Sequence, residues 1–521
     1  MTVYHGAVVS VNANDDVFQY LVEHKGRIVY VGDTLPKKYR KAPVVELGKR
    51  ALIPPFADTH QHFASFSAFN AGLNVMEARS NAEILDMVDR FAADCPSKTL
   101  IAFGASPYSV EERRLVSRGE LDTVTHGKPL FLVKYDGHAC VVNTALLDKL
   151  PGGLRKMRGY HADTGEMNQE AFFRFSDYIS SSLSLIDLFR NMQDAVDFMA
   201  ARGIGMVNTV SGVGFALNLD ITFEKIFAKA LRNGFQLRVF PQPMKIRVAT
   251  SRRLPRIGGC FESALDGCFG SHDAAMNEPY TDAEGGSGVL YYSDEKVTAF
   301  CKEANRAGLR IEMHAIGDKA FDQAAKALKA ALDDCPREDH RHGIIHDCLP
   351  TEAGIHICRD YHIQMPVQSA FIHWKQEPDE YLTSIMGAER VSRLNPIRTF
   401  RDNGIVVSFG SDAPCTTPDP IVWMDKAVNN GSESVTIQDA LRMCTINGYY
   451  ATFDDRERGS LETGKIADMV LLSENPYEAG ADHIRDIRVE KLILGGEDYR
   501  SCKRPVGKAI LDGLTNGSRS Y

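Results

Sequence analysis

The pattern of apolar and polar positions differs between the two ends and the middle of this 521-residue chain. Residues 1–50 and 455–521 contain short runs in which apolar and polar residues alternate, separated by turns such as Lys25-Gly26. This two-residue period is typical of β-strands with one buried face. Because chain termini often lie close together, we predict that the two segments combine into one small β-sandwich.

Residues 51–454 follow a different rhythm, in which apolar runs alternate with helix-like segments such as 293–308 and 319–334. That alternation is typical of a parallel α/β fold. The strand candidates are the apolar runs 51–60, 203–210, 235–242, 258–267, 309–317, 342–348, 362–368 and 404–412. Eight such units over roughly 400 residues predict a TIM-like (β/α)8 barrel.

The stretch between the first two strand candidates, about 65–195, is too long for a simple strand-to-helix connection. It contains a strand-like run of its own at residues 128–143. We therefore predict that an inserted subdomain interrupts the barrel at this point.

Charge and cysteine use narrow the class of protein. The formal charge is −8, so no basic surplus is present to meet nucleic-acid phosphates. No apolar run approaches the roughly 18 residues of a membrane span, and residues 1–16 lack the pattern of a secretory signal. The 11 cysteines include no CxxC pair, which favours a reduced, cytoplasmic enzyme with a small-molecule substrate.

Ionisable residues end several of the predicted barrel strands. The C-terminal ends of barrel strands face the active-site mouth, and alternate positions on a strand share one face. Buried imidazoles and carboxylates are costly without partners, and a divalent metal would ligate the former and neutralise the latter. The candidate ligands are His60, His62, Glu262, His314, His346 and Asp412.

Several motifs resemble those of the amidohydrolase superfamily, in the same order. They are "GRIVYVGD", "LIPPFADTHQH", "DGHACVVNTALL", "LDGCFGSHDA", "MHAIGDKAFD", "DHRHGIIHD", "FGSDAP" and "GSLETGKIADMVLL". Within the superfamily the chain resembles the YtcJ-like group, which includes N-substituted formamide deformylases, over nearly its whole length.

The resemblance implies a ligand set. His60 and His62 would bind the more buried metal with Asp412, while His314 and His346 would bind a second one. The ion would be zinc, with manganese or iron as alternatives, and one or two ions per chain. Family members are often dimers, so a homodimer is expected.

One departure from the family concerns the bridging ligand. The family places a carboxylated lysine four residues before the aspartate that corresponds to Asp266, whereas this chain has Glu262 there. A glutamate carboxylate could bridge two metals. Because its side chain is shorter than a carboxylated lysine, a site with one metal is the alternative. Lys134 is a remote alternative ligand and is expected instead as a surface or substrate-facing cation.

Other departures concern the pocket. His272 and Ile345 stand where the family has arginine and glutamate, so the particular substrate of a relative is not carried over. The candidate substrate-binding residues are Asp136, His138, Gln368, Arg398 and His272. Arg398 could clamp a carboxylate or carbonyl, or form a surface ion pair. Aromatic residues such as Phe69 and Trp374 are expected in the core or the pocket wall.

These residues predict hydrolysis of a C–N bond in an amide, a formamide or a cyclic amide. Asp412 is the candidate general base, because it ends the eighth strand beside the predicted metal. Single-metal deamination of a heterocycle, and a hydration or decarboxylation, are alternative reactions. A non-catalytic binding scaffold is a third hypothesis, which the four retained histidines and Asp412 disfavour.

Overall fold

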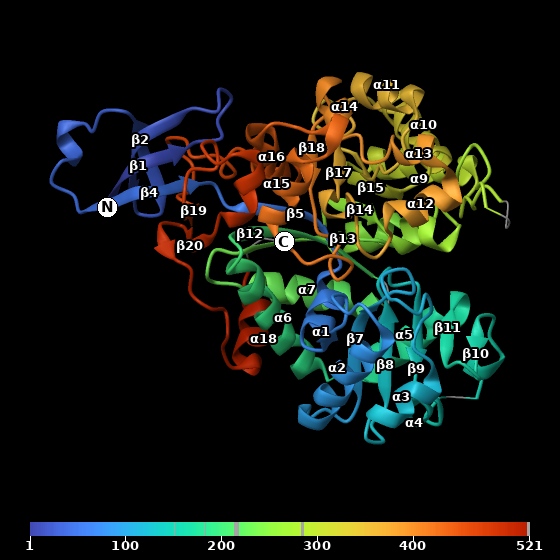
Figure 1. Ribbon diagram of the computed structural model, residues 1–521. Coiled ribbons are helices and arrows are strands. Elements are labelled where there is room, and N and C mark those ends of the chain that lie inside the picture. Colours follow the sequence, from blue (N-terminus) through green and yellow to red (C-terminus); the bar gives the residue numbers. More distant parts are fainter. Residues whose placement is uncertain (151, 183, 213–217, 283–285, 518–521) are drawn as a thin grey trace.

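The computed structural model describes residues 1–150, 152–182, 184–212, 218–282 and 286–517, so the last four residues of the predicted 455–521 segment lie outside it (Figure 1). Strands and helices occur in both ends and the middle of the chain, which confirms the expected α/β fold. Among the described residues, no helix has the length and apolar character needed to cross a bilayer.

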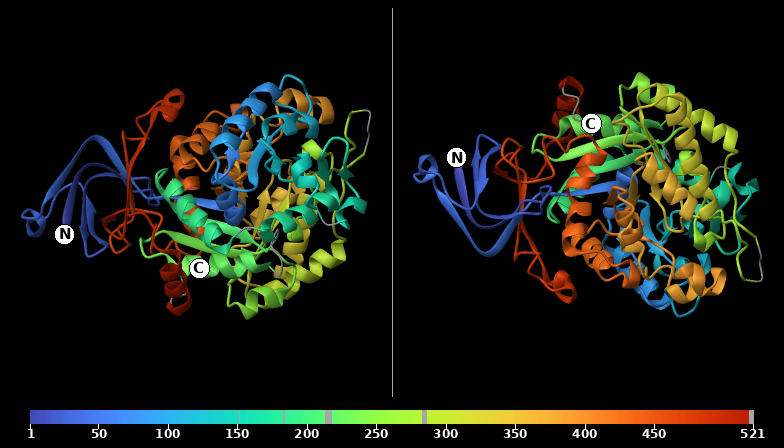
Figure 2. Two further views of the ribbon diagram at one scale, coloured as in Figure 1. Left: turned by 90° about the horizontal axis from the view of Figure 1, so that it is seen from below. Right: turned by 90° about the horizontal axis from the view of Figure 1, so that it is seen from above.

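The two ends of the chain meet in one seven-stranded sheet. Its strands, in order across the sheet, are β21 (Glu497–Asp498), β20 (Val489–Leu494), β19 (Met469–Leu472), β4 (Val44–Ile53), β1 (Thr2–Val9), β2 (Val17–His24) and β3 (Arg27–Gly32). Strand β4 joins the halves, since it runs parallel to β1 and antiparallel to β19. The termini therefore pair in one hydrogen-bonded sheet, which stands beside the rest of the molecule (Figure 2), where the sequence predicted the two sheets of a β-sandwich.

Two prolines divide the first predicted strand. Strand β4 ends at Ile53 and β5 (Phe56–Gln61) begins after Pro54 and Pro55. Proline has no backbone N–H and cannot continue a hydrogen-bonded ladder. The predicted strand 51–60 is thus two strands, one in the terminal sheet and one that carries His60.

In the part of the chain that the structure describes, eight strands form a ring, and their hydrogen-bonded pairs are parallel. They are β5, β12 (Ile204–Ser211), β13 (Gln236–Pro241), β14 (Arg256–Gly259), β15 (Arg310–Ala315), β16 (Gly343–His346), β17 (Met365–Val367) and β18 (Val407–Phe409). Hydrogen bonds join β5 to β12 and β12 to β13, β14 to β15 and β15 to β16, and β17 to β18. Contacts of β13 with β14, β16 with β17 and β18 with β5 close the ring.

Alternation along the strands separates packing residues from functional ones. In β15, Ile311 and Met313 belong to the main hydrophobic core, which includes residues of the surrounding helices α9 (Asp294–Arg306) and α10 (Asp318–Asp334). Arg310, Glu312 and His314 occupy the alternate positions and face the barrel interior. Arg310 and Glu312 are fully buried and form an ion pair there. The same period therefore places His314 at the top of the interior.

The inserted stretch builds a sheet of its own, in the order β10 (Tyr160–His161), β11 (Glu166–Asn168), β9 (Ala139–Val142), β8 (Leu130–Lys134), β7 (Leu100–Ala105) and β6 (Leu73–Asn74). Helices α2 (Asn81–Asp94), α3 (Arg118–Val124) and α5 (Gln169–Ser182) accompany it beside the barrel (Figure 1). The strand-like run at 128–143 is an antiparallel hairpin of β8 and β9. Its turn carries the DGH motif.

A buried carboxylate fastens the helix after β5 to the second barrel strand. Glu224 on α7 (Leu219–Ala230) accepts hydrogen bonds from the Ala64 backbone N–H at 3.0 Å and from the Thr209 hydroxyl at 3.2 Å. It also bonds the Ser211 hydroxyl. Burial, together with the nearby charge of Asp220, raises the pKa of Glu224 to about 8.

Replacement of Glu224 by glutamine is expected to change how stability depends on pH. Because folding raises the pKa of Glu224 from 4.5 to about 8, its contribution to stability is complete below about pH 4.5 and is lost as the pH rises toward 8. Relative to wild type, Glu224→Gln should gain up to about 1.4 kcal/mol of stability per pH unit across that interval. Urea-unfolding midpoints of both proteins between pH 5 and 9 measure the difference, and a constant offset would contradict it.

Candidate metal centre

Two histidines and an aspartate meet where β5 and β18 end. The Nε2 atoms of His60 and His62 each lie 3.2 Å from Oδ1 of Asp412, and all three side chains are buried. The Asp412 backbone N–H donates to the His60 carbonyl at 2.8 Å, which joins the ends of the two strands. The structure therefore brings together the predicted ligands of the first and eighth strands.

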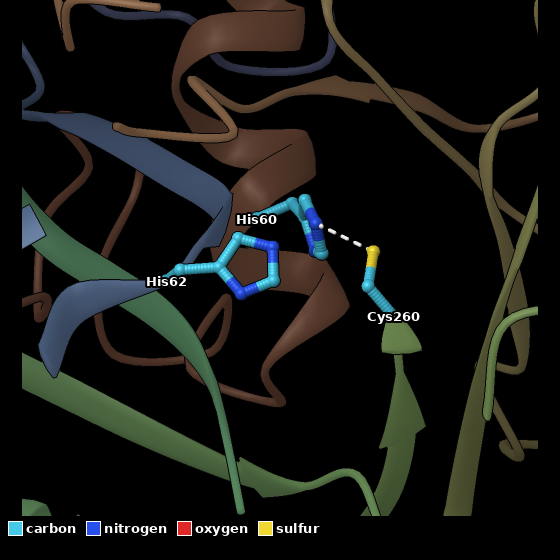
Figure 3. A group of neighbouring side chains, drawn as sticks. All are labelled: His60, His62 and Cys260. Atoms are coloured by element: carbon cyan, nitrogen blue, oxygen red, sulfur yellow. Dashed lines mark hydrogen bonds between the residues drawn. The ribbon is translucent and has the colours of Figure 1, made fainter. Parts of the chain in front are cut away.

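The sulfur of Cys260 lies at the centre of the remaining predicted ligands. It is 3.2 Å from His60 Nε2, 3.5 Å from His346 Nε2 and 3.6 Å from His314 Nδ1. Figure 3 shows the thiol rising from the end of β14 toward His60, with His62 beside it. The sequence reasoning missed Cys260 because scattered cysteines are usually small buried hydrophobes. Cys260 follows Gly258 by two residues, so strand alternation places it on the inward face, and this position could have indicated a ligand.

Glu262, in contrast, does not reach this group. Strand β14 ends at Gly259, earlier than the predicted strand 258–267, and Phe261 adopts a left-handed φ of 49° in the turn that follows. This turn leaves Glu262 exposed, with its backbone carbonyl accepting a hydrogen bond from the Tyr292 hydroxyl at 2.7 Å. The prediction that Glu262 lies among the histidines is therefore corrected. Cys260 lies in the position among the histidines that was predicted for Glu262.

The spacings between the donor atoms match ligation of a shared metal ion better than they match direct hydrogen bonds between the side chains. Among the residues that the structure describes, three groups have ligand atoms within 4.8 Å of one another: His60, His62 and Cys260; Cys260, His314 and His346; and His60, His346 and Asp412. A thiol carries one hydrogen and cannot donate to three imidazoles at once. Tetrahedral zinc with its usual Zn–S and Zn–N bonds separates sulfur from nitrogen by about 3.5 Å, close to the observed spacings.

The outer nitrogens of two histidines have partners that set their orientation. Nδ1 of His346 lies 2.6 Å from the Gln368 amide oxygen, and Nε2 of His314 lies 3.3 Å from the Gly267 carbonyl. Donation through these nitrogens leaves the opposite nitrogen of each ring facing Cys260 without a proton. Gln368, predicted to contact substrate, thus holds a candidate ligand instead.

The electrostatics of the imidazoles and of Asp412 suit metal binding, whereas burial raises the pKa of the Cys260 thiol, so that an ion would have to displace its proton. Burial, followed by the nearby His314, lowers the pKa of His346 well below its usual range, and burial likewise lowers the pKa of His60. Burial alone would raise the pKa of Asp412, but the nearby imidazoles of His60 and His62 hold it well below its ordinary value. Neutral imidazoles and an ionised carboxylate are the forms that bind a metal.

Two buried aspartates fix the loops around the centre. Asp58 accepts the backbone N–H of Ser411 at 2.9 Å and its hydroxyl at 2.6 Å, which ties β5 to the turn before Asp412. Asp266 accepts the backbone N–H groups of Ile316 at 3.0 Å and Gly317 at 2.8 Å, beyond His314. Neither aspartate was singled out as a site residue from the sequence, although both lie within recognised motifs.

Backbone conformation at the strand ends is strained. His346 has φ 76° and Asp412 has φ 52°, both in the left-handed region that residues other than glycine rarely adopt. Such a conformation costs on the order of 1–3 kcal/mol and persists where the surroundings over-determine it. The bonds to Gln368 and to the β5 backbone provide that support.

A cavity of about 2050 Å³ opens over the centre, and both the barrel and the inserted sheet line it. The barrel contributes Cys260, His314, His346 and Asp412, and the insertion contributes Lys134, Asp136 and His138. The aromatic wall includes Phe69, Phe103, Phe131, Phe371 and Trp374, as expected for Phe69 and Trp374. Such a concave space, lined by both aromatic and charged side chains, suits a small organic molecule.

Most of the chain matches a known family profile, that of the amidohydrolase family, over residues 43–497. The chain belongs to the amidohydrolase family. The N-substituted formamide deformylase of Arthrobacter pascens is 23% identical to this amidohydrolase over 95% of this chain and 97% of that protein. The putative amidohydrolase YtcJ of Bacillus subtilis (strain 168) is 22% identical over 89% and 92% of the two chains. The resemblance to the YtcJ-like group is therefore confirmed.

Solved structures share the fold of this amidohydrolase. An uncharacterized metal-dependent hydrolase from Pyrococcus horikoshii OT3 superimposes with a TM-score of 0.75, at 22% identity, and covers 92% of this chain and 99% of that one. The corresponding uncharacterized hydrolase from Pyrococcus furiosus gives a TM-score of 0.73, also at 22% identity, over 92% and 100% of the two chains.

The remaining predicted substrate residues of the amidohydrolase differ in their placement. Asp136 pairs with Lys134 at 2.8 Å in the cavity wall, and His138 lies 6.0 Å from the Phe261 ring. Arg398 is exposed on α14 (Ile397–Asp402), where it pairs with Asp402 at 3.4 Å and does not line the cavity. The substrate-clamp interpretation of Arg398 is therefore wrong, because its helix carries the side chain outward.

His272 also fails to reach the cavity of the amidohydrolase. Its imidazole bonds the Asp282 carboxylate and packs against Tyr280, with ring centroids 4.9 Å apart. The neighbouring Ser271 and Asp273 line the cavity, whereas His272 adopts a left-handed φ of 56° that turns its side chain away. The prediction that His272 contacts substrate is corrected accordingly.

The metal content of two variants should show whether Cys260 or Glu262 is a metal ligand. Cys260→Ser replaces a soft thiolate by a hydroxyl and is expected to weaken zinc binding by at least about tenfold. Glu262→Gln is expected to leave zinc binding unchanged, since the side chain is exposed. Zinc per chain after dialysis against a competing chelator measures both, and circular dichroism controls for folding. Full zinc occupancy in Cys260→Ser, or loss in Glu262→Gln, would reverse the assignment.

Proposed function

We propose that this amidohydrolase hydrolyses a C–N bond in an amide, an N-formyl or N-acyl amine, or a cyclic amide. The observation that carries the proposal is the convergence of four imidazoles, a thiol and a carboxylate at the floor of one cavity. The residues proposed to hold the metal are His60, His62, Cys260, His314, His346 and Asp412.

Zinc is the ion that this donor set fits best. Thiolate and imidazole are the ligands zinc prefers, whereas manganese favours carboxylate and water. Cys260 belongs to two of the three candidate groups, so its sulfur offers a shared ligand for one or two ions. When bound, a divalent ion supplies Lewis acidity, which activates water at neutral pH and polarises a carbonyl oxygen.

Asp412 is placed to move the proton that hydrolysis requires. Its Oδ1 faces His60 and His62, and the side chain lines the cavity. In the part of the chain that the structure describes, no hydrogen bond engages either carboxylate oxygen, and Oδ1 is buried. The carboxylate would accept a proton from the attacking water and deliver it to the leaving nitrogen, which then departs as the amine.

A relative's name indicates where to begin the search for a substrate. The Arthrobacter pascens relative is named N-substituted formamide deformylase, so N-formyl amines are the first compounds to offer. The aromatic cavity favours an apolar or aromatic substituent on the nitrogen, because such groups gain most from burial there.

The chain is also proposed to consist of two units. We assign residues 1–50 with 455–521 to a composite β unit, and 51–454 to the hydrolase barrel with its insertion at about 65–195. Separate hydrophobic clusters in the terminal sheet and in the insertion support this division. Eleven free cysteines support a cytoplasmic location, and a homodimer rests on the family resemblance.

Asp412→Asn is expected to abolish most turnover without blocking the cavity. Loss of a positioned acid–base lowers kcat by about 10²- to 10⁴-fold. Zinc-loaded protein would be offered N-formyl and N-acyl amines, cyclic imides and aminated heterocycles, at zinc concentrations that saturate the variant. Arg398→Ala serves as the control and should keep wild-type kcat/KM, since its side chain lies outside the cavity.

Two outcomes of that screen would overturn parts of the proposal. Turnover unchanged in Asp412→Asn would exclude its acid–base role. Ammonia released from a heterocycle, with no amide cleaved, would make the amidohydrolase a deaminase.

A further inference from the structure

A buried carboxylate in the cavity wall takes no part in the chemistry described above. Glu377 is 9% exposed and lines the cavity. Its Oε1 accepts hydrogen bonds from the Tyr135 hydroxyl at 2.7 Å and from the Gly270 backbone N–H at 3.1 Å. Both donors are neutral, and among the described residues no hydrogen bond engages Oε2.

The charges around Glu377 do not balance. The buried ammonium of Lys134 is bound to Asp136 at 2.8 Å, and although burial would lower its pKa, the charge of Asp136 keeps that pKa raised. Two buried carboxylates therefore face one ammonium. Burial raises the pKa of Glu377, which reflects the cost of a charge without a cationic partner. A cation arriving from the cavity would remove that cost.

An aromatic row leads from the metal centre to this carboxylate. The His346 and Phe371 rings are stacked with centroids 6.1 Å apart, and the Phe371 and Trp374 centroids lie 4.7 Å apart. Trp374 in turn lies 5.1 Å from Tyr135, whose hydroxyl donates to Glu377. Phe371 and Trp374 both line the cavity. Aromatic faces attract cations, and tryptophan does so most strongly.

The backbone is shaped to hold Glu377 in this position. A Cβ atom on Gly270 would lie 2.3 Å from Glu377 Oε1 and 2.4 Å from the Tyr135 hydroxyl oxygen, so a larger residue there would displace both atoms from their present positions. The Tyr108 hydroxyl donates to the Gly270 carbonyl at 2.9 Å and fixes the other side of that peptide. The inserted sheet and the loop after β14 thus both support the carboxylate.

We propose that Glu377, together with Phe371 and Trp374, forms a subsite for a protonated amine of the substrate. The inference rests on the proposed function. It narrows the substrate to an amide that carries an ammonium group remote from the scissile bond, joined to it by an aromatic or apolar spacer. The spacer would lie along the aromatic row while the ammonium donates to Oε2 of Glu377.

Three substrates that differ only in the remote group test the subsite on the wild-type protein. They are N-formylbenzylamines with a para aminomethyl, methyl or carboxylate substituent. We expect kcat/KM to be highest for the aminomethyl compound, by about 10- to 100-fold over the methyl compound, and lowest for the carboxylate. Equal kcat/KM for the aminomethyl and methyl compounds would overturn the subsite without any variant.

Variants then assign the effect to Glu377. Glu377→Gln should reduce kcat/KM for the aminomethyl substrate by about 10- to 100-fold and change that for the methyl substrate less than about twofold. Glu380→Gln, on the same segment but exposed, is the matched control and should behave as wild type. Equal losses on both substrates would show that Glu377 acts only in folding.

Binding distinguishes failure of the subsite from failure of the proposed function. Benzylamine is titrated calorimetrically into zinc-loaded wild type and Glu377→Gln, with benzyl alcohol as the neutral comparison. We expect benzylamine to bind wild type at least about tenfold more tightly than the variant. Such binding without cleavage of any amide would overturn only the hydrolase proposal, whereas equal binding to both proteins would overturn the subsite.

Discussion

The shared contact of Cys260 with three imidazoles is the feature on which the centre depends. Its sulfur lies within 3.6 Å of nitrogens from His60, His314 and His346, and each of these residues ends a different strand. Buried polar groups of this kind cannot satisfy one another with the single proton of a thiol. The strained turns and the buried aspartates Asp58 and Asp266 make sense as the supports that keep these atoms together.

The barrel keeps packing and chemistry on opposite sides of each strand. Outward positions of β15 join the apolar core, while inward positions carry an ion pair below and His314 above. The insertion then closes the space over the strand ends and contributes part of its aromatic wall, including Phe69, Phe103 and Phe131. The candidate metal ligands thus come from the barrel alone, whereas the barrel and the insertion together build the cavity wall that would meet the substrate.

Much of this arrangement could be predicted from the sequence, since strand period and strand ends are local properties. The apolar runs indicated the positions of His60, His62, His314, His346 and Asp412. The direction of a side chain after a strand has ended could not be predicted. Glu262 lies beyond the left-handed turn at Phe261, and that turn exposes it while Cys260 faces inward. The predictions that Arg398 and His272 contact substrate fail for the same reason. A motif shows which residues are near one another in the sequence, but it does not show where their side chains point.

X-ray absorption at the zinc edge of the zinc-loaded protein tests the role of Cys260 most directly. A sulfur ligand at about 2.3 Å, together with nitrogen and oxygen at about 2.0–2.1 Å, is the result that the geometry predicts. The sulfur signal should disappear in Cys260→Ser. A wild-type spectrum containing only nitrogen and oxygen ligands would contradict the placement of this thiol on the metal.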